Sequence, residues 1–515
     1  MATYINTFRL KLAPEYDYDF NVDWGDSSGL DEYTFTTAGS SEEESFVDHV
    51  YGSPGIYDVK IYERSTKGFP KLYFNGLSNS SSTTDDIKLT NIIEWGYHTW
   101  VDLSGSFAGC SNLSSINTER AFSDLNLVKK FNSAWAGCSG LNTFPYLNVT
   151  SGTAFTSAWS NCFSLTSFPV LSTQLATDFS FAWSGCKSLI AFPSLSTQSG
   201  SNFANAWSNC VKLKTFPLIA TLSGTNFNSA WSNCFSLTSF PVLSTQSATD
   251  FSFAWQNCVS LSGFPLLSAH KVNNFDGTWF GCSALKSFPA NFNTSSGTSF
   301  ASAWANCVSL AGAFPAIVTL SAQNLSYAWY NCSLITGVFP NINIKNATNL
   351  NSTWYNCKNI SSFSPTLSTQ NVTNFSNAWY GCSAIKSFSS IDTSKGTDFS
   401  GTWANCKSLT ALPLVNTSIG ETFDSTFLNC SSLTSLPLLD TSKGKSFKFT
   451  WSGCTSLTSI GNFNTTLGTS FKGAWQNCKS LKAFPNLNVA NGTDFSYAWY
   501  NCTKLSASNF PLIDL

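Results

Sequence analysis

The fold is decided by the stretch FSFAWSGCKSLIAFPSL at residues 179–195, which recurs with small changes along most of the chain. Large apolar residues stand seven and three positions before its cysteine, Cys186, and three, six and nine positions after it. After a first step of 28 residues, the cysteines are always 24 or 25 residues apart, at positions 110, 138, 162, 186, 210, 234, 258, 282, 307, 332, 357, 382, 406, 430, 454, 478 and 502. One coil of this size cannot enclose a core, but stacked coils bury a continuous one. The period therefore predicts a solenoid of about seventeen coils.

The first half of each coil is predicted to be a short helix. Apolar or small residues stand at i, i+3, i+4 and i+7 up to the cysteine, as in Phe155, Ala158, Trp159 and Cys162. This pattern is one face of a helix about two turns long. The residue before the cysteine is Asn or Gly in all seventeen coils, and these residue types tolerate the left-handed backbone that ends helices. We therefore expect the helix to end at the cysteine.

The second half of each coil is predicted to hold a short β-strand. Leu165, Phe168 and Leu171 recur at every third residue, and a proline such as Pro169 follows the phenylalanine. Proline removes a backbone donor that a central ladder needs, so any regular strand should be confined to a few residues ahead of it.

Charge separates the chain into different parts. Residues 1–66 hold thirteen acidic and four basic side chains, a net charge of −9, whereas residues 67–515 hold sixteen and twenty-three, a net charge of +7. The segment 1–14 alternates polar and apolar residues as a first β-strand would. We expect a small all-β domain at 1–66, a connector and N-terminal cap of the solenoid at 67–100, and the solenoid itself at 101–515.

The core columns are predicted from the same register. Trp stands three residues before the cysteine in fifteen coils, and Phe107 and Phe427 replace it in the other two. One cysteine per coil at the end of the predicted helix indicates a column of buried, reduced thiols that serve as small apolar residues. Sporadic disulfides between stacked cysteines are conceivable on distance alone, but an odd count in an unbroken column argues against designed pairing.

Catalytic and metal chemistry find little support in the sequence. Titratable groups are scattered, so no enzyme, cofactor or resident metal is predicted. Zinc would need close cysteine pairs, and the only histidines are His49, His98 and His270. Asp23 and Asp26 are interpreted as turn residues, with a metal role as the alternative. A carboxylate recurs just before the core phenylalanine, where it can cap a helix, and calcium binding stays open there: Asp178, Asp250, Asp398 and Asp494.

Neither nucleic-acid binding nor membrane insertion is predicted. The C-terminal coils are rich in lysine, but Arg120 is the only arginine of the solenoid, so a solvated face is the better interpretation than nucleic-acid recognition. No run of eighteen apolar residues exists, which predicts no membrane insertion. The N-terminus also lacks the features of a signal peptide. A surface built from Ser, Thr and Asn without an export signal favours a location on a virion surface, with an extracellular or cell-surface location as the alternative.

An aromatic strip is the candidate binding site. On the predicted helix, positions five and two before the cysteine lie about 140–200° from the core-facing phenylalanine, so their side chains should face solvent. Most are small and polar, but some coils carry aromatic residues there: Phe280, Tyr327, Tyr330, Tyr355 and Tyr380, and finally Tyr497 and Tyr500. Tyr330, Tyr355 and Tyr380 belong to successive coils and should stand roughly 5 Å apart. The alternative is that these rings merely pack on one another or follow drift after duplication.

A second contact is expected at the C-terminal end. The last apolar residues, 509–515, follow directly on the last coil, so we expect this end to pack against a virion subunit or another copy of the chain. The alternative is that these residues fold back over the last coil as a lid.

The repeat resembles a known family. The run Ala-Trp-x-Asn-Cys-x-Ser-Leu-Thr-Ser-Phe-Pro at 158–169 and 230–241 is similar to the leucine-rich repeat of BspA-like surface proteins, whose coils carry Ala-Phe-x-x-Cys-x-x-Leu-x-x-Ile and then Pro. The likeness covers residues 101–515, with Trp usually in place of the family's Phe or Met and Phe in place of Ile. It implies a more aromatic core on the same architecture.

The first domain also has a likeness. Residues 22–26 (VDWGD) and 48–61 (DHVYGSPGIYDVKI) resemble the polycystic-kidney-disease (PKD) type of β-sandwich over about residues 3–66. The resemblance implies that Trp24-Gly25-Asp26 forms a turn and that the His-x-Tyr and Tyr-x-Val-x-Ile segments are paired strands. The predicted fold is thus a BspA-like solenoid with a short helix and a short strand per coil, preceded by a small β-sandwich.

Three function classes differ in how well they fit the sequence. The combination of domains resembles attachment proteins of bacteria and their viruses, and the leading hypothesis is a non-enzymatic virion protein of the phage tail-fibre or capsid-surface type that contacts a glycan or protein of the host surface. The alternative is a cellular surface adhesin or extracellular filament protein. A glycan-active enzyme is the third class, and it lacks the paired carboxylates that such chemistry needs.

Overall fold

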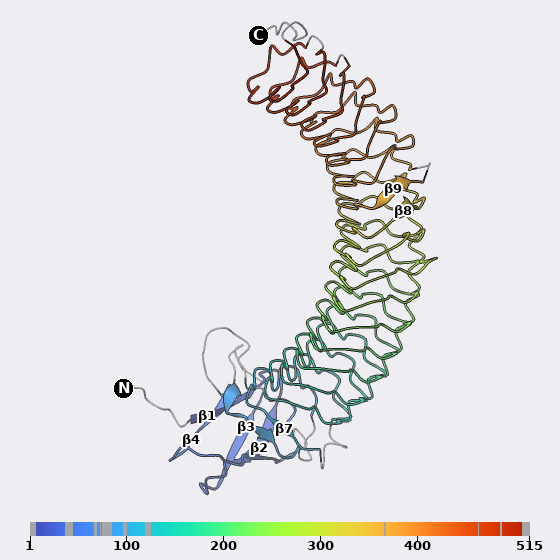
Figure 1. The fold of residues 1–515 in the computed structure, drawn as a ribbon. Helices are drawn as coiled ribbons and strands as arrows, with labels where there is room; N and C mark the ends of the chain where they lie inside the picture. The colour runs from blue at the N-terminus through green and yellow to red at the C-terminus, as the bar shows by residue number, and fades with distance from the viewer. Residues whose placement is uncertain are drawn as a thin grey trace. The chain divides into compact units, whose positions relative to one another are not determined.

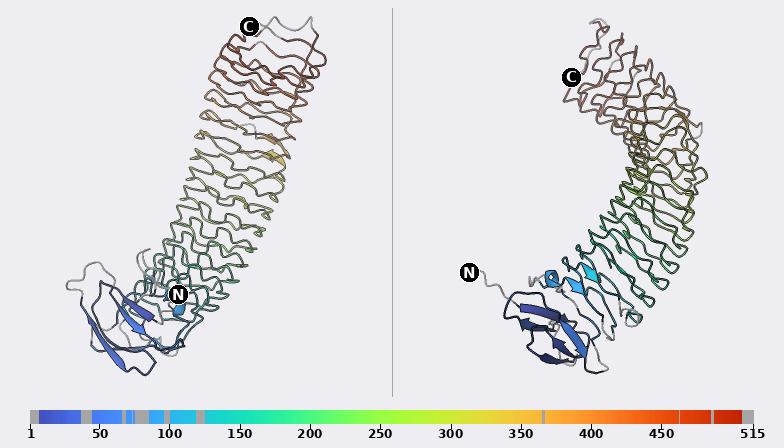
Figure 2. Two further views of the ribbon diagram at one scale, coloured as in Figure 1. Left: turned by 90° about the vertical axis from the view of Figure 1, so that its left-hand side faces the viewer. Right: turned by 60° about the horizontal axis from the view of Figure 1, so that its bottom comes forward.

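The computed structural model describes residues 7–36, 45–65, 69–72, 74, 85–95, 100–118, 125–364, 367–461, 463–484 and 487–506. It divides into two compact units, Met1–Ser247 and Ala248–Leu515. The first unit holds an N-terminal β part and the coils around six of the cysteines, and the second unit holds the coils around the other eleven. Within each unit the coils lie one upon the next, as the ribbons show (Figure 2).

The N-terminal part forms two small antiparallel sheets (Figure 1). One sheet pairs β1 (Thr7–Leu12) with β4 (Ser45–Val50), and the other has the order β3 (Leu30–Phe35), β2 (Tyr18–Asp23), β5 (Lys60–Glu63). Alternate residues of β2 are buried, as the two-residue period of a strand requires: Tyr18, Phe20 and Val22.

The strand pairing implied by the PKD resemblance is wrong in one respect. Strand β4, which contains His49, pairs with β1, whereas β5, which contains Ile61, pairs with β2. The two segments therefore do not pair with each other. Their side chains still meet, because Tyr51 and Tyr57 stack with ring centroids 4.0 Å apart.

Regular strands are rare in the coils. The named ones form two parallel pairs, β6 (Asn91–Ile92) with β7 (Ser115–Ile116) and β8 (Gly337–Phe339) with β9 (Ile360–Phe363). Other coils contribute single parallel bridges at the same place, such as Thr143 with Ser167. A bridge or short strand ahead of the proline is thus present in some coils, as predicted. Most of the single bridges lie instead eight residues before the cysteine, as between Ala154 and Asp178, a position that the sequence does not predict.

The predicted two-turn helix is wrong. Across the described parts of the chain the only helical element is the 3-10 helix η1 (Asp86–Lys88), and the segment before each cysteine is a run of tight turns. The residue before the cysteine has φ between 56° and 83° in every coil, as its Asn or Gly identity predicts. The residue five before the cysteine is also left-handed in every coil, with φ between 53° and 70°. A right-handed helix cannot pass through two such residues.

Hydrogen bonding explains why this run replaces a helix. In the coil of Cys162, the N–H of Trp159 donates to the carbonyl of Ala182 in the next coil at 2.8 Å. The N–H of Cys162 instead bonds three residues back, to Trp159, at 3.3 Å. Alternate N–H groups therefore leave the segment and join neighbouring coils. The apolar spacing resembles that of a helix because the left-handed residues recur four positions apart.

Aromatic stacking forms the core of the coils. In the second unit, Trp329 lies 5.3 Å from Trp304 and 5.8 Å from Trp354, with interplanar angles of 4° in both pairs. Phe339 meets Trp329 and Trp354 edge to face at 5.0 and 5.6 Å. Such geometries add to the stabilisation from burial. The indole N–H groups of this column are buried with no hydrogen-bond partner among the described residues at Trp135, Trp159, Trp183, Trp207, Trp279, Trp304, Trp329, Trp354, Trp379, Trp403, Trp451 and Trp475.

The cysteine column is buried and holds no disulfide, as predicted. All seventeen cysteines are buried thiols. Their thiols also donate hydrogen bonds that the sequence does not reveal, as from Cys162 Sγ to the carbonyl of Trp135 at 3.2 Å and from Cys357 Sγ to that of Trp329 at 3.1 Å. Burial raises the pKa of the Cys162 and Cys332 thiols to about 12. The thiol is therefore both a small core group and a link between coils.

We expect these thiols to resist alkylation and disulfide exchange in the native chain. The thiolate is the reactive form, and a pKa of about 12 leaves very little of it at pH 8. In a titration with a chromogenic disulfide reagent at pH 8, fewer than about one thiol per chain should react in the time that suffices for all of them in guanidinium. Rapid labelling of several cysteines without denaturant would contradict the buried column.

A threonine column also links the coils, and sequence reasoning missed it. Thr173, Thr197 and Thr221 are at most 1% exposed. Their hydroxyls donate to the next coil, to the carbonyls of Ser196, Ala220 and Ser244, at 2.8, 2.6 and 2.7 Å. Buried hydroxyls need such partners, so the threonine is a structural link and not a surface residue.

Candidate functional site

The predicted aromatic strip lies on the run of turns. Within each unit, after its first coil, the carbonyl of the residue two before the cysteine accepts an N–H from the preceding coil, which holds successive coils at hydrogen-bonding distance. These bonds join Asn306 to Tyr330, Asn331 to Tyr355 and Asn356 to Tyr380, each at 2.7 Å. The backbone thus places the three tyrosines in register, although the helical geometry used to predict their direction is absent.

The three rings form a tyrosine stack, the name used below for Tyr330, Tyr355 and Tyr380. Ring centroids are 4.7 Å apart for Tyr330 and Tyr355, with an interplanar angle of 18°, and 4.3 Å apart for Tyr355 and Tyr380, with an angle of 2°. Tyr327 meets Tyr330 at 5.6 Å in a tilted arrangement. The coils on either side carry Ala305 and Ala404 at the same position, so the stack is three rings long.

Stacking changes what this surface can present. All three side chains are half-buried, and Tyr355 is covered on both ring faces by its neighbours. Burial, and then the neighbouring Tyr380, raises the pKa of Tyr355 to about 12, so its phenol stays neutral at physiological pH. The stack therefore offers ring edges, a row of hydroxyls and the outer faces of Tyr330 and Tyr380. These groups suit hydrogen bonding to a polar partner more than broad face-to-face contact.

The other predicted strip residues lie apart from the stack. Phe280 is half-buried, belongs to a coil two steps before that of Tyr330, and has no aromatic neighbour among the described residues. Tyr497 and Tyr500 are 64% and 60% exposed and meet at 6.0 Å edge to face. Tyr327 and Tyr497 have left-handed backbone, at φ 58°, as the residue five before the cysteine does in every coil.

An asparagine ladder runs beside the stack. The carboxamide of Asn331 donates from Nδ2 to Oδ1 of Asn306, and that of Asn356 to Oδ1 of Asn331, both at 3.0 Å. From the Asn before the cysteine, the sequence predicts a left-handed backbone and no role for the side chain. The structure shows that its side chain also joins coils along the surface.

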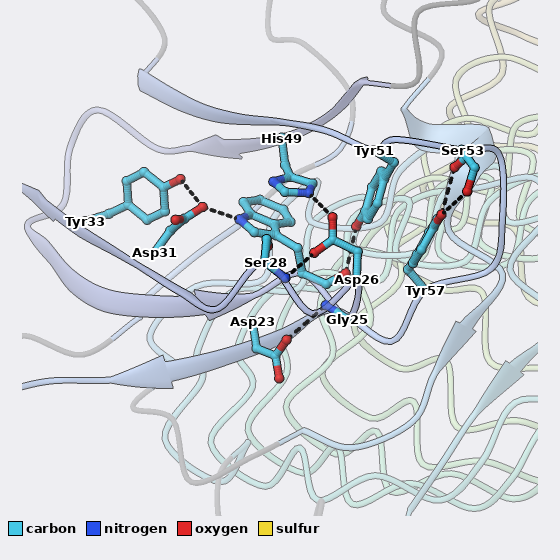
Figure 3. Close-up of polar contacts among 11 residues, drawn as sticks. Asp23, Gly25, Asp26, Ser28, Asp31, Tyr33, His49, Tyr51, Ser53 and Tyr57 are labelled. Atoms are coloured by element: carbon cyan, nitrogen blue, oxygen red, sulfur yellow. Dashed lines mark hydrogen bonds and ion pairs between the residues drawn. The ribbon is translucent and has the colours of Figure 1, made fainter.

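A second polar cluster lies in the N-terminal part (Figure 3). Trp24 is fully buried and donates from Nε1 to Asp31 at 2.7 Å, while His49 stacks on its ring at 4.8 Å. His49 Nε2 lies 2.7 Å from Asp26 Oδ2. Hydrogen bonds from Ser28 and then from His49 lower the pKa of Asp26 to about 2.

This cluster closes a turn. Asp23 and Asp26 each accept the backbone N–H two residues on, from Gly25 at 2.9 Å and Ser28 at 3.0 Å. Both act as the turn residues that the sequence predicts. Within the described residues, no group of three His, Cys, Asp or Glu side chains is placed to hold a metal ion.

The carboxylates before the core phenylalanine also cap turns and not helices. Each accepts the backbone N–H two residues on, at 2.7–2.9 Å: Asp178, Asp250, Asp398 and Asp494. The acceptor role is as predicted, and the helix is the part that is wrong. His98 and residues 509–515 lie outside the described residues. Nowhere in the described part is a helix long and apolar enough to cross a membrane.

Comparison with known proteins identifies the repeat. Residues 103–229 and 424–512 match the BspA type leucine-rich repeat region, in six copies. Residues 249–365 and 349–457 match a family described as a Mycoplasma protein of unknown function. The coils thus include leucine-rich repeats of the BspA type, which the sequence register predicts.

Solved structures with leucine-rich repeats are also similar. One from Bacteroides ovatus is 14% identical, with 77% of this chain and 86% of that chain covered and a TM-score of 0.38. Another from Eubacterium ventriosum is 13% identical, with 69% and 83% covered and a TM-score of 0.27. No curated protein matches the chain.

Proposed function

We propose that this chain, which carries leucine-rich repeats of the BspA type, is a non-enzymatic surface adhesin that binds a glycan or protein of another surface. The match to the BspA type repeat is the observation that carries the proposal, because these repeats are typical of surface proteins with adhesive roles. The tyrosine stack supports it, since it places a row of phenols on the surface of three successive coils.

A virion role is the second candidate. The virion interpretation depends on the sequence of the N-terminal segment, whereas the family match favours the cellular adhesin. The gene neighbourhood would discriminate between the virion protein and the cellular adhesin, because neighbouring tail and capsid genes would favour the virion protein. The two antiparallel sheets at the N-terminus, with Trp24-Gly25-Asp26 at a turn, support a PKD-like domain as part of either protein.

The tyrosine stack is tested by replacing Tyr330, Tyr355 and Tyr380 together with serine. We expect adhesion of the purified chain to a mucin-coated surface to fall by about tenfold or more, since clustered aromatic residues dominate binding surfaces. The fold should survive, because other coils carry serine at this position, as at Ser160, and the lost stacking is worth about 1–3 kcal/mol in total.

The matched control replaces Tyr497 and Tyr500 with serine and leaves the stack intact. This variant should adhere like the unaltered chain. If the triple variant adheres normally and its self-association in sedimentation is also unchanged, the stack is not the binding site.

A further inference from the structure

The tyrosine stack holds two of its rings in an alignment that suits a reaction between them. Tyr355 and Tyr380 leave neighbouring coils at the same position of the repeat, and their ring centroids lie 4.3 Å apart with an interplanar angle of 2°. The pKa of Tyr355 is raised to about 12 by burial, by the nearby Tyr380 and by a hydrogen bond between the two phenols. The rings are therefore parallel, point the same way and carry their hydroxyls side by side.

This alignment brings together the atoms that react when phenols are oxidised. Removal of one electron and one proton from a phenol gives a phenoxyl radical, whose unpaired electron lies on the oxygen and on the ortho and para carbons of the ring. The para carbon of tyrosine carries the side chain, so new carbon–carbon bonds form at the ortho carbons. In two parallel rings with adjacent hydroxyls, the ortho carbons face each other and their π orbitals point across the gap. Such proximity and orientation favour a reaction between two groups.

A second stacked pair, Tyr51 and Tyr57 in the N-terminal part, lacks this alignment. Its ring centroids are 4.0 Å apart, with an interplanar angle of 14°. Tyr51 donates its hydroxyl to the carbonyl of Trp24 at 3.1 Å, and Tyr57 donates to that of Ser53 at 2.7 Å. The two hydroxyls therefore point in opposite directions (Figure 3). An ortho carbon of one ring then faces a carbon of the other ring that carries little of the unpaired electron.

Other oxidisable groups close to the stack are buried. The three indoles that directly precede the tyrosines are fully buried, at Trp329, Trp354 and Trp379. The thiols are buried as well, and a raised pKa, as at Cys332, keeps them out of the reactive thiolate form. The tyrosines of the stack are half-buried, so an oxidant in solution can reach the edges of their rings. Oxidation at this surface should therefore fall on the phenols.

We propose that the tyrosine stack is a site of oxidative cross-linking, in which Tyr355 and Tyr380 are joined as dityrosine. Two molecules of a one-electron oxidant each take one electron from one phenol, and the two phenolic protons pass to solvent. The two radicals then pair their electrons in a new bond between ortho carbons. The hydrogen on each of these carbons moves through solvent to the oxygen of its own ring, which restores both phenols. The product has lost two hydrogen atoms in all, and its formation does not depend on the proposed adhesive function.

The test is photo-oxidation of the full chain at high dilution with tris(bipyridine)ruthenium and persulfate, which together supply a one-electron oxidant. We expect dityrosine fluorescence and, after proteolysis, a linked pair of peptides that contain positions 355 and 380. The mass of this pair should be two hydrogen atoms below the sum of the separate peptides.

The decisive variant is Tyr355→Phe, which should remove the linked peptides and their fluorescence because phenylalanine forms no phenoxyl radical. Tyr355 also faces Tyr330, at 4.7 Å with an interplanar angle of 18°, so this one substitution removes both pairs. The phenyl ring keeps the stacking, and the variant should fold like the unaltered chain. A link between coils also limits the freedom of the unfolded chain. The oxidised chain should therefore need more urea to unfold than oxidised Tyr355→Phe.

Two controls separate alignment from proximity. Tyr57→Phe removes the second stacked pair and should leave the yield of dityrosine unchanged. Oxidation in guanidinium, which unfolds the stack, should abolish the link between positions 355 and 380. The proposal would be overturned if the unaltered chain gave no such link, if dityrosine persisted in Tyr355→Phe, or if Tyr51 and Tyr57 were linked in equal yield. Links that join only different copies of the chain would also contradict it.

Discussion

Replacing Trp354 with alanine is expected to lower the free energy of unfolding by about 3–5 kcal/mol, the range for truncating a large buried aromatic residue. Trp354 is fully buried. It stacks on Trp329 and Trp379, both at 5.8 Å, and meets Phe363 edge to face at 4.9 Å. Alanine removes all of these contacts and leaves a cavity between two coils. The measurement is the shift of the urea unfolding curve.

The control for this prediction is Trp354→Phe, which should cost no more than about 1–1.5 kcal/mol. Phe427 already takes this position in another coil and stacks on Trp403 at 5.3 Å with an angle of 3°. The substitution also removes the buried indole N–H of Trp354, which has no partner among the described residues. A loss as large as that of alanine would contradict the prediction that a phenyl ring can replace the indole in this column.

Replacing Asn356 with valine is expected to lower the free energy of unfolding by about 2–3 kcal/mol. Asn356 has φ 58°, and a branched side chain there costs about 1–2 kcal/mol in backbone strain. The change also removes the hydrogen bond of 3.0 Å to Asn331, worth about 1 kcal/mol. Urea unfolding measures the sum.

The matched control here is Asn356→Gly. Glycine loses the same side-chain bond but takes the left-handed backbone without strain, as Gly381 does in the next coil at φ 73°. It should cost about 1 kcal/mol or less. Equal losses for valine and glycine would show that the side chain matters and the backbone conformation does not.

Much of the coil could be predicted because the same residue types recur at the positions that face the core. Trp, Cys and Leu recur in one register, and each column is buried where that register places it, as at Trp159, Cys162 and Leu165. The left-handed residue before the cysteine was also predictable, since only Asn and Gly stand there. These features depend on single residues, so the sequence alone reveals them.

The run of turns could not be predicted because its cause is not local. Serine at position 157 is an ordinary residue, yet it has φ 57°. Its conformation follows from the bond that its N–H makes to Ser180 of the next coil at 2.8 Å. A helical wheel does not show a hydrogen-bond partner 23 residues away. The apolar spacing is compatible with a helix and with the run of turns.

The candidate binding surface could also be predicted only in part. The spacing of the tyrosine stack, roughly 5 Å, was predictable from the stacking of coils. The face-to-face packing of the rings was not predictable, because it depends on side-chain packing between coils, as between Tyr355 and Tyr380.

The hydrogen bonds between coils also set the kinetics of folding. Cys162 and Thr173 bond to carbonyls 27 and 23 residues away, and equivalent pairs recur along each unit. Every coil therefore closes a loop of similar length, and the entropic cost of adding a coil stays the same however many precede it. Contacts of this range keep the relative contact order low in a long chain, which favours fast propagation from any nucleus. The slow step is then the first pairing of neighbouring coils, because a single coil has no partner for the N–H groups that its turns direct outward.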